Sequence, residues 1–267
     1  MSAWDQLAAF WGTGWDVHPE RVLFFALMVG AYAAGFVRLG GGQRQGGRYV
    51  AWFGLGMTLL VLAVQSPLHH LADRYLFSAH MVQHQILTLI VPPLLLLGVP
   101  PWMATPVLDR AWIVRFGRSQ YYPVFAFAAF NLFFALVHFP SVYDALFRDE
   151  LLHFVTHGAL LVSGLLTWLP LFSPAPDVLR RLPLPGQMIY CLAQSIPGSL
   201  VGSLIALSER LVYRHYGTEP LTLGVDPLSD QQLGGLFMWV GTGTFFLVLL
   251  TVLFFIWAER EERHAFG

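Results

Sequence analysis

The sequence predicts an all-α integral membrane protein, a bundle of about seven transmembrane helices forming a single polytopic domain over residues 1–267. Three observations predict this class: an apolar composition, seven long apolar segments, and little charge inside them. Hydrophobic residues make up 56% of the chain and charged residues only 12%. Soluble domains carry about 25% charged residues, so we expect this chain to be multi-pass and surrounded by lipid.

Seven segments are long enough for a membrane-spanning helix, which needs roughly 20 mostly apolar residues. They cover residues 20–39, 50–66, 78–98, 121–139, 151–171, 186–207 and 235–257. Pro92 and Pro93 lie in the third span, and we expect them to kink or break it because proline lacks a backbone donor. Residues 1–19 contain Trp4, Trp11 and Trp15 but no continuous apolar core. We therefore expect an interfacial segment there and no cleavable signal peptide.

Arginine placement predicts the orientation, because arginine-rich connectors stay in the cytoplasm. All fifteen basic residues are arginine. The first, third and fifth connectors and the C-terminal tail hold ten of them, and the opposite side holds five. We therefore predict an N-terminus outside the membrane and a C-terminus in the cytoplasm.

Charge and nucleophile content narrow the function classes. The formal net charge of −1 leaves no basic excess to neutralise phosphates, which argues against a nucleic-acid partner. The one cysteine, Cys191, lies inside an apolar span and permits no disulfide framework. The sequence contains no nucleotide-binding glycine loop and no plausible Ser-His-Asp or Cys-His constellation. It offers ligands rather than a catalytic acid and base.

Two pairs of histidines are the sharpest chemical feature. His80 and His84 begin the third span, and His153 and His157 begin the fifth. Residues four apart share one helix face, so each pair directs two imidazoles to the same side. Imidazole suits copper, zinc, iron and nickel, and ionisable groups inside apolar spans are costly and mark functional sites. The pairs predict one intramembrane metal site shared by two helices.

The predicted topology places further histidines beside these pairs. His138 falls at the outer end of the fourth span, where we expect it to complete or gate the site. His69 and His70 lie in the turn before the third span. Because neighbouring residues cannot face one point on a helix, at most one of them is a ligand, and either metal capture or an ordinary wet loop fits the pair. The site should face the periplasm or exterior.

Other residues near this face are auxiliary candidates. Asp230 opens the seventh span, where we expect it to cap that helix, with orientation of a ligating imidazole as the alternative. Met81 and Met238 are soft donors that suit Cu(I), although methionine in an apolar helix usually packs. Gln231 and Asp73 complete the auxiliary set.

Several of these residues belong to motifs that resemble a known family. The motifs are Asp73 with Leu76-Phe77-Ser78-Ala79-His80-Met81-Val82-Gln83-His84, Pro92-Pro93-Leu94-Leu95 with Gly98-Val99-Pro100, His138-Phe139-Pro140 with Tyr143, His153 with His157, Gly164 with Trp168-Leu169-Pro170, and Asp230-Gln231-Gln232 with Gly234-Gly235 and Met238-Trp239. In this order, over roughly residues 50–258, they resemble the CtaG-type cytochrome c oxidase assembly proteins of bacteria. The resemblance implies a seven-helix protein of the bacterial inner (plasma) membrane that aids copper insertion at the CuB centre of haem-copper oxidase.

The histidines and the resemblance together give the hypothesis of a metallochaperone that is not an enzyme. Copper, as Cu(I) or Cu(II), would be held by His80, His84, His153 and His157, with His138 auxiliary, and passed to oxidase subunit I. Periplasmic copper donor proteins would be further partners. Three alternatives stay open: a membrane enzyme with histidine-ligated b-type haem, a di-metal redox enzyme, and a metal-free assembly scaffold.

Overall fold

Helices dominate the computed structural model, which describes residues 11–12, 15, 18–40 and 46–266. None of these described residues lies in a β-strand. Six helices are long and apolar enough to cross a membrane, and a bent helix pair forms a candidate seventh span. The predicted all-α membrane fold is therefore confirmed, while the orientation of its ends stays a prediction.

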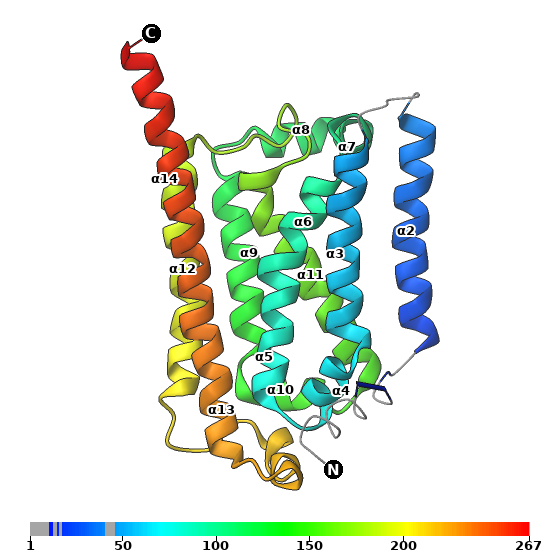
Figure 1. Cartoon of the computed structure of the whole chain (residues 1–267), viewed down its shortest axis with the longest axis vertical. Helices are drawn as coiled ribbons and strands as arrows, with labels where there is room; N and C mark the ends of the chain where they lie inside the picture. Colours follow the sequence, from blue (N-terminus) through cyan, green and yellow to red (C-terminus); the bar gives the residue numbers. More distant parts are fainter. Residues whose placement is uncertain (1–10, 13–14, 16–17, 41–45, 267) are drawn as a thin grey trace.

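The spans run alongside one another through the bundle (Figure 1). In chain order they are α2 (Pro19–Leu39), α3 (Gly47–Gln65), α5 (Phe77–Gln85) continued by η1 (Ile86–Ile90) and α6 (Val91–Gly98), α9 (Tyr122–Val137), α11 (Glu150–Phe172), α12 (Leu184–Ala206), and α13 (Pro227–Leu236) continued by η4 (Phe237–Gly241) and α14 (Thr242–Phe266). The helix α9 passes the length test only together with α8 (Ala111–Gly117), from which it is bent by 90°. The last span begins at Pro227, earlier than the predicted residue 235.

Short elements close the two ends of the bundle. At one end lie α4 (Pro67–Arg74) and α10 (Pro140–Leu146), while α7 (Pro101–Leu108) and α8 lie at the other, together with the C-terminal end of α14 (Figure 1). The connection between α12 and α13 contains the 3₁₀-helices η2 (Arg214–Tyr216) and η3 (Glu219–Leu223). The predicted histidine pairs both begin spans at the α4 and α10 end, so the fold brings them to the same end of the bundle.

The proline pair does not break the third span. The helix continues from Phe77 to Gly98, and the five residues before Val91 form a π-helix. Proline at 92 lacks the N–H that would bond the Thr88 carbonyl in an α-helix. The indole Nε1–H of Trp168 on α11 donates to that carbonyl instead, at 2.7 Å. A side chain from a neighbouring span therefore satisfies the acceptor that the proline leaves open, as membrane helices require.

Close helix contact fixes the last span against α12. A Cβ atom added at Gly202 would lie 2.5 Å from the backbone nitrogen of Trp239, and one added at Gly235 would lie 2.4 Å from that of Ala206. Only glycine permits this approach, because a side chain at either position would overlap these backbone atoms. Membrane helices commonly associate through small residues in this way. The contact places α13 beside the end of α12 and so sets the position of Asp230.

The first span is the least buried of the six candidate spans. It stands at one edge of the bundle (Figure 1) and buries only Arg21 and Phe25. The Arg21 guanidinium donates to the Val64 carbonyl at 3.3 Å and lies 3.4 Å from Glu150. Most of the predicted interfacial segment before this span lies outside the described residues; Trp11 and Trp15, which are described, are exposed.

Substitution of Gly202 by alanine should weaken the joint between α12 and the last span. The new methyl group would overlap backbone atoms, and such overpacking costs about 1–3 kcal/mol. Thermal unfolding in detergent measures the loss. Gly54→Ala is the matched control, because no atom lies within 4 Å of its added Cβ. Equal unfolding temperatures for the two variants would contradict the close contact.

Candidate metal centre

Two helix starts position the paired histidines. In α11, the Asp149 side chain accepts from the Leu152 amide at 2.9 Å and caps the first turn. The start of α5 has no cap from its own residue Leu76. An acceptor for its free amides must come from another part of the chain, since buried amides without a partner are costly.

Asp230 supplies that acceptor from the seventh span. Its carboxylate accepts from the Phe77 amide at 2.7 Å and also contacts the amide and the hydroxyl of Ser78. The prediction that Asp230 caps its own helix is wrong: α13 begins at Pro227, and Asp226 caps it by accepting from the Ser229 amide. Asp230 lies one turn further along, so its side chain is free to cap α5. It thereby fixes the turn that carries His80.

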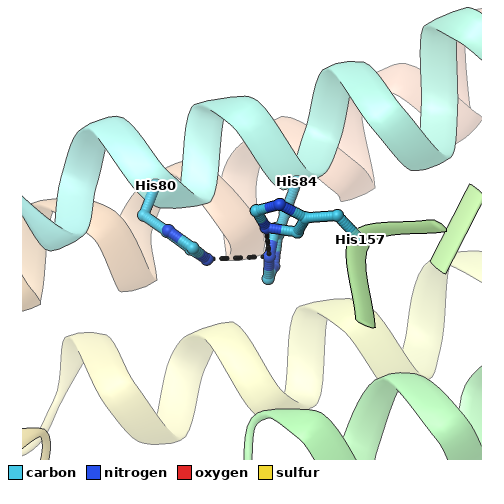
Figure 2. Close-up of side chains that lie close together, drawn as sticks. All are labelled: His80, His84 and His157. Carbon is cyan, nitrogen blue, oxygen red and sulfur yellow. Dashed lines mark hydrogen bonds between the residues drawn. The ribbon is translucent and has the colours of Figure 1, made fainter. Parts of the chain in front are cut away.

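Three of the predicted ligands converge on one point. Figure 2 shows His80 and His84 pointing from α5 toward His157 on α11. The Nε2 atoms of His80 and His84 are 2.8 Å apart, and those of His84 and His157 are 3.2 Å apart. Each of these three buried side chains offers a ligand atom within 4.8 Å of the other two. We call these three residues the histidine trio.

His138 contacts one member of the trio, His84. Its Nδ1 lies 2.7 Å from the Phe134 carbonyl, which can only accept, so this nitrogen carries the proton of a neutral ring. Its Nε2 is then an acceptor and lies 3.2 Å from Nδ1 of His84. Nδ1 of His84 must donate, which leaves the Nε2 lone pair of His84 facing His80 and His157. His138, predicted to complete or gate the site, therefore orients the ring of His84 by accepting from its Nδ1, as the partners of metal-bound histidines do.

His153 lies beside the trio and is oriented by Asp73. Its ring is 4.4 Å from that of His157 between centroids and stacks on that of His80 at 5.3 Å. Its Nδ1 is 2.9 Å from the Asp73 carboxylate. Burial pulls the pKa of Asp73 upward, but the hydrogen bond and charge of His153 outweigh it and hold the pKa at about 2. Among the described residues, Nε2 of His153 has no hydrogen-bond partner.

The two adjacent histidines of α4 have different surroundings. His69 is buried, its Nδ1 lies 3.1 Å from the amide nitrogen of Gln83, and its ring is 6.3 Å from that of His157. Burial, followed by the positive charge of Arg21, lowers the pKa of His69 to about 4. The ring of His70 instead packs near Tyr75, at 5.8 Å. One histidine of the pair thus approaches the trio, as the helix geometry predicts.

The remaining auxiliary candidates contact the surroundings of the trio and offer no ligand atom to it. Met81 and Met238 are fully buried in an apolar cluster with Phe77 and other aromatic residues. Gln231 accepts from the amide of Val212 at 2.6 Å and so anchors the connection between α12 and α13. That connection covers the site, because the hydroxyl of Tyr213 donates to the His138 carbonyl at 2.8 Å.

The sequence prediction assigned no role to several residues that hold the site. Gln83 contacts His69, the Phe134 carbonyl fixes His138, and Arg21 ties α2 to the histidine end. Gln83 and Arg21 carried a signal, since each is polar within an apolar span. The Phe134 carbonyl carried none, because every residue has one.

With the geometry established, comparison with known proteins identifies the family. Residues 30–260 match the family model described as cytochrome c oxidase caa3 assembly factor (Caa3_CtaG). The chain belongs to this family. The predicted family is therefore confirmed.

Curated relatives of this family member come from mycobacteria. An uncharacterized protein of Mycobacterium bovis and one of Mycobacterium tuberculosis are each 29% identical over 88% of the chain and 39% of their own length. An uncharacterized protein of Mycobacterium leprae is 27% identical over 99% of the chain and 45% of its own length. The chain thus spans less than half the length of these relatives. No solved structure gives a significant match.

Loss of the Asp230 carboxylate should disturb the candidate metal centre as well as stability. Asp230→Ala leaves the buried Phe77 and Ser78 amides without their acceptor, and loss of a cap costs about 0.5–2 kcal/mol. Because the first turn of α5 carries His80, metal affinity should fall with stability. Thermal unfolding and metal titration of purified protein measure both effects.

Asp226→Ala is the control for this prediction, since it removes a cap from α13 without touching α5. It should leave metal affinity unchanged. Equal losses of metal affinity in the two variants would show that the cap on α5 has no special role in the site.

Proposed function

We propose that this oxidase assembly factor is a membrane metallochaperone that holds Cu(I) on His80, His84 and His157 and passes it to subunit I of haem-copper oxidase for the CuB centre. One observation carries the proposal: three buried imidazole nitrogens meet within 4.8 Å of one another inside an apolar bundle. Burial of polar rings at such a point is costly unless a partner satisfies them.

The spacing of the trio fits a metal ion. Two nitrogens that each lie about 2.0–2.1 Å from one ion are about 3.3–3.6 Å apart at tetrahedral to trigonal angles. The observed separations of 2.8 and 3.2 Å are close to this range, so small side-chain shifts would accommodate the ion. The lone pair of His84 already faces the centre, because His138 takes its Nδ1 proton.

The charge of the ligands favours a monovalent ion. The trio contains no carboxylate, so the full charge of a bound ion remains in an apolar setting. The cost of desolvating an ion rises steeply with its charge, and imidazole is a suitable ligand for copper. Cu(I) therefore fits better than Cu(II) or zinc. A neutral set of three ligands also leaves coordination positions open, which ligand exchange with an acceptor requires.

The family supports the destination of the cargo. A cytochrome c oxidase assembly factor must interact with the oxidase, and CuB is a copper site within that enzyme's membrane subunit. We propose subunit I as the recipient and periplasmic copper proteins as donors, in the inner membrane of the bacterial cell. Transfer of a cargo ion breaks no covalent bond of a substrate, so we propose that the protein is not an enzyme.

The two enzyme alternatives gain no support from the geometry of the trio. A bis-histidine haem needs its two axial ligands on opposite faces of the porphyrin, whereas the His84 and His157 nitrogens are 3.2 Å apart. A di-metal centre needs bridging carboxylates or more imidazoles than the three that meet here among the described residues.

Replacement of His84 should abolish copper binding. His84→Ala removes the central ligand and should weaken Cu(I) binding about 100-fold or more, since even loss of a supporting residue costs 10–100-fold. Chelator competition with detergent-purified protein measures the affinity, and the copper content of the oxidase from cells carrying the variant measures maturation. His264→Ala, on the exposed end of α14, is the matched control. Wild-type affinity and a fully copper-loaded oxidase with His84→Ala would disprove the assignment.

A further inference from the structure

A polar cavity of about 230 Å³ lies at the histidine end of the bundle. Its wall includes Asp73, His70, His153 and the exposed side chain of Glu150, so water reaches it. No member of the trio lines this cavity. Of the two histidine pairs predicted from the sequence, His153 alone contributes to its wall.

His153 therefore lies between water and the buried trio. One side of its environment is the cavity; on the other, its ring packs against those of His80 and His157, at 5.3 and 4.4 Å between centroids. His69 also lines the cavity, but its ring is 6.3 Å from that of His157 and is not recorded in contact with His80, so His153 is the nearer polar link between the cavity and the trio. A second cavity, which touches the trio at His157, is lined by apolar residues such as Phe24 and Leu161 and offers an ion no such path.

The Nε2 atom of His153 is available to bind a cation. Its Nδ1 lies 2.9 Å from a carboxylate oxygen of Asp73, which favours the proton on Nδ1 and the lone pair on Nε2. That nitrogen is buried and has no hydrogen-bond partner among the described residues, a condition that a native structure rarely tolerates without a functional reason. The carboxylate–imidazole pair is the arrangement that raises the basicity of metal-binding histidines.

The charges of the cavity wall do not oppose a cation. Its carboxylates, Asp73 and Glu150, balance its guanidinium groups, Arg21 and Arg74. Glu150 also lies 3.4 Å from Arg21, so part of the positive charge is neutralised directly. A monovalent ion therefore meets no excess of like charge on its way to His153.

We propose that His153 is a loading ligand, which takes Cu(I) from the polar cavity and passes it to the trio, and that it is not a permanent fourth ligand. The proposal rests on the copper-chaperone function above. Nε2 of His153 forms a bond to the ion as the incoming donor ligand leaves, and that bond breaks when the trio nitrogens take over. Copper stays Cu(I) throughout. Nδ1 of His153 stays protonated and faces the Asp73 carboxylate.

The placement of His153 separates it from the resting site. Ligand atoms of His80, His84 and His157 all lie within 4.8 Å of one another, and His153 is outside that group. Its partner Asp73 belongs to α4, on the cavity side, and holds the ring there. Because the orienting carboxylate lies on α4 while the trio lies on α5 and α11, the ring of His153 is held by a contact that the trio does not share.

The test compares the rate of loading with the affinity at equilibrium. Purified full-length protein in detergent is mixed without oxygen with the coloured Cu(I)–bicinchoninate complex, and the loss of colour gives the rate. Competition with the same chelator gives the affinity, and X-ray absorption gives the number of imidazole ligands. His153→Ala should slow loading about tenfold or more, change the affinity little, and leave three imidazoles around copper.

Two further variants sharpen the result. Asp73→Asn keeps the ring of His153 but removes the carboxylate charge that raises the basicity of the ring, so it should slow loading in the same direction. It also serves if His153→Ala fails to fold. His264→Ala removes a histidine on the exposed end of α14 that does not line the cavity, and it should load at the wild-type rate.

The outcomes separate the two proposals. Wild-type loading by both His153→Ala and Asp73→Asn would overturn the loading role. A fall in affinity with His153→Ala as large as that with His84→Ala, together with loss of one imidazole from four, would make His153 a permanent ligand and overturn it as well. If the wild-type chain takes up no Cu(I) from the chelator, the copper-chaperone function itself is wrong.

Discussion

The hydrogen bonds between Asp230 and the start of α5 are the constraint on which the site depends. They join the third span to the seventh across most of the sequence, and they occupy the amides of Phe77 and Ser78. A helix start buried in a membrane protein cannot leave those donors to water. The position of His80, one turn further along, follows from this cap. The close contact of Gly202 with α13 serves the same end, because it sets the place from which Asp230 reaches across.

Two arms orient imidazoles at the site by the same logic. On one side, the Phe134 carbonyl holds the proton of His138, and His138 in turn holds that of His84. On the other, Asp73 holds the proton of His153. In both arms an acceptor fixes the proton on one ring nitrogen and leaves the lone pair of the other nitrogen for a ligand. The two arms differ in where they end: the first inside the trio, the second at the wall of the polar cavity.

Two features of the third span continue the helix beyond the histidines. The third span keeps its helix through Pro92, and the indole N–H of Trp168 donates to the Thr88 carbonyl in place of the N–H that proline lacks. The π-helix between His84 and Val91 lies directly after the trio residues, and such segments occur at functional sites.

The sequence by itself determined the spans and the histidine pairs, because a membrane-spanning helix needs a long apolar segment and a helix places residues four apart on one face. His80 with His84, and His153 with His157, could be predicted to share faces for that reason alone. Only the tertiary structure decided which rings meet: His84 and His157 belong to different spans, and so do Asp230 and Phe77. It also assigned His138 and Asp73 their supporting places. Such contacts depend on how distant helices pack and turn about their axes, and local periodicity contains no information on either.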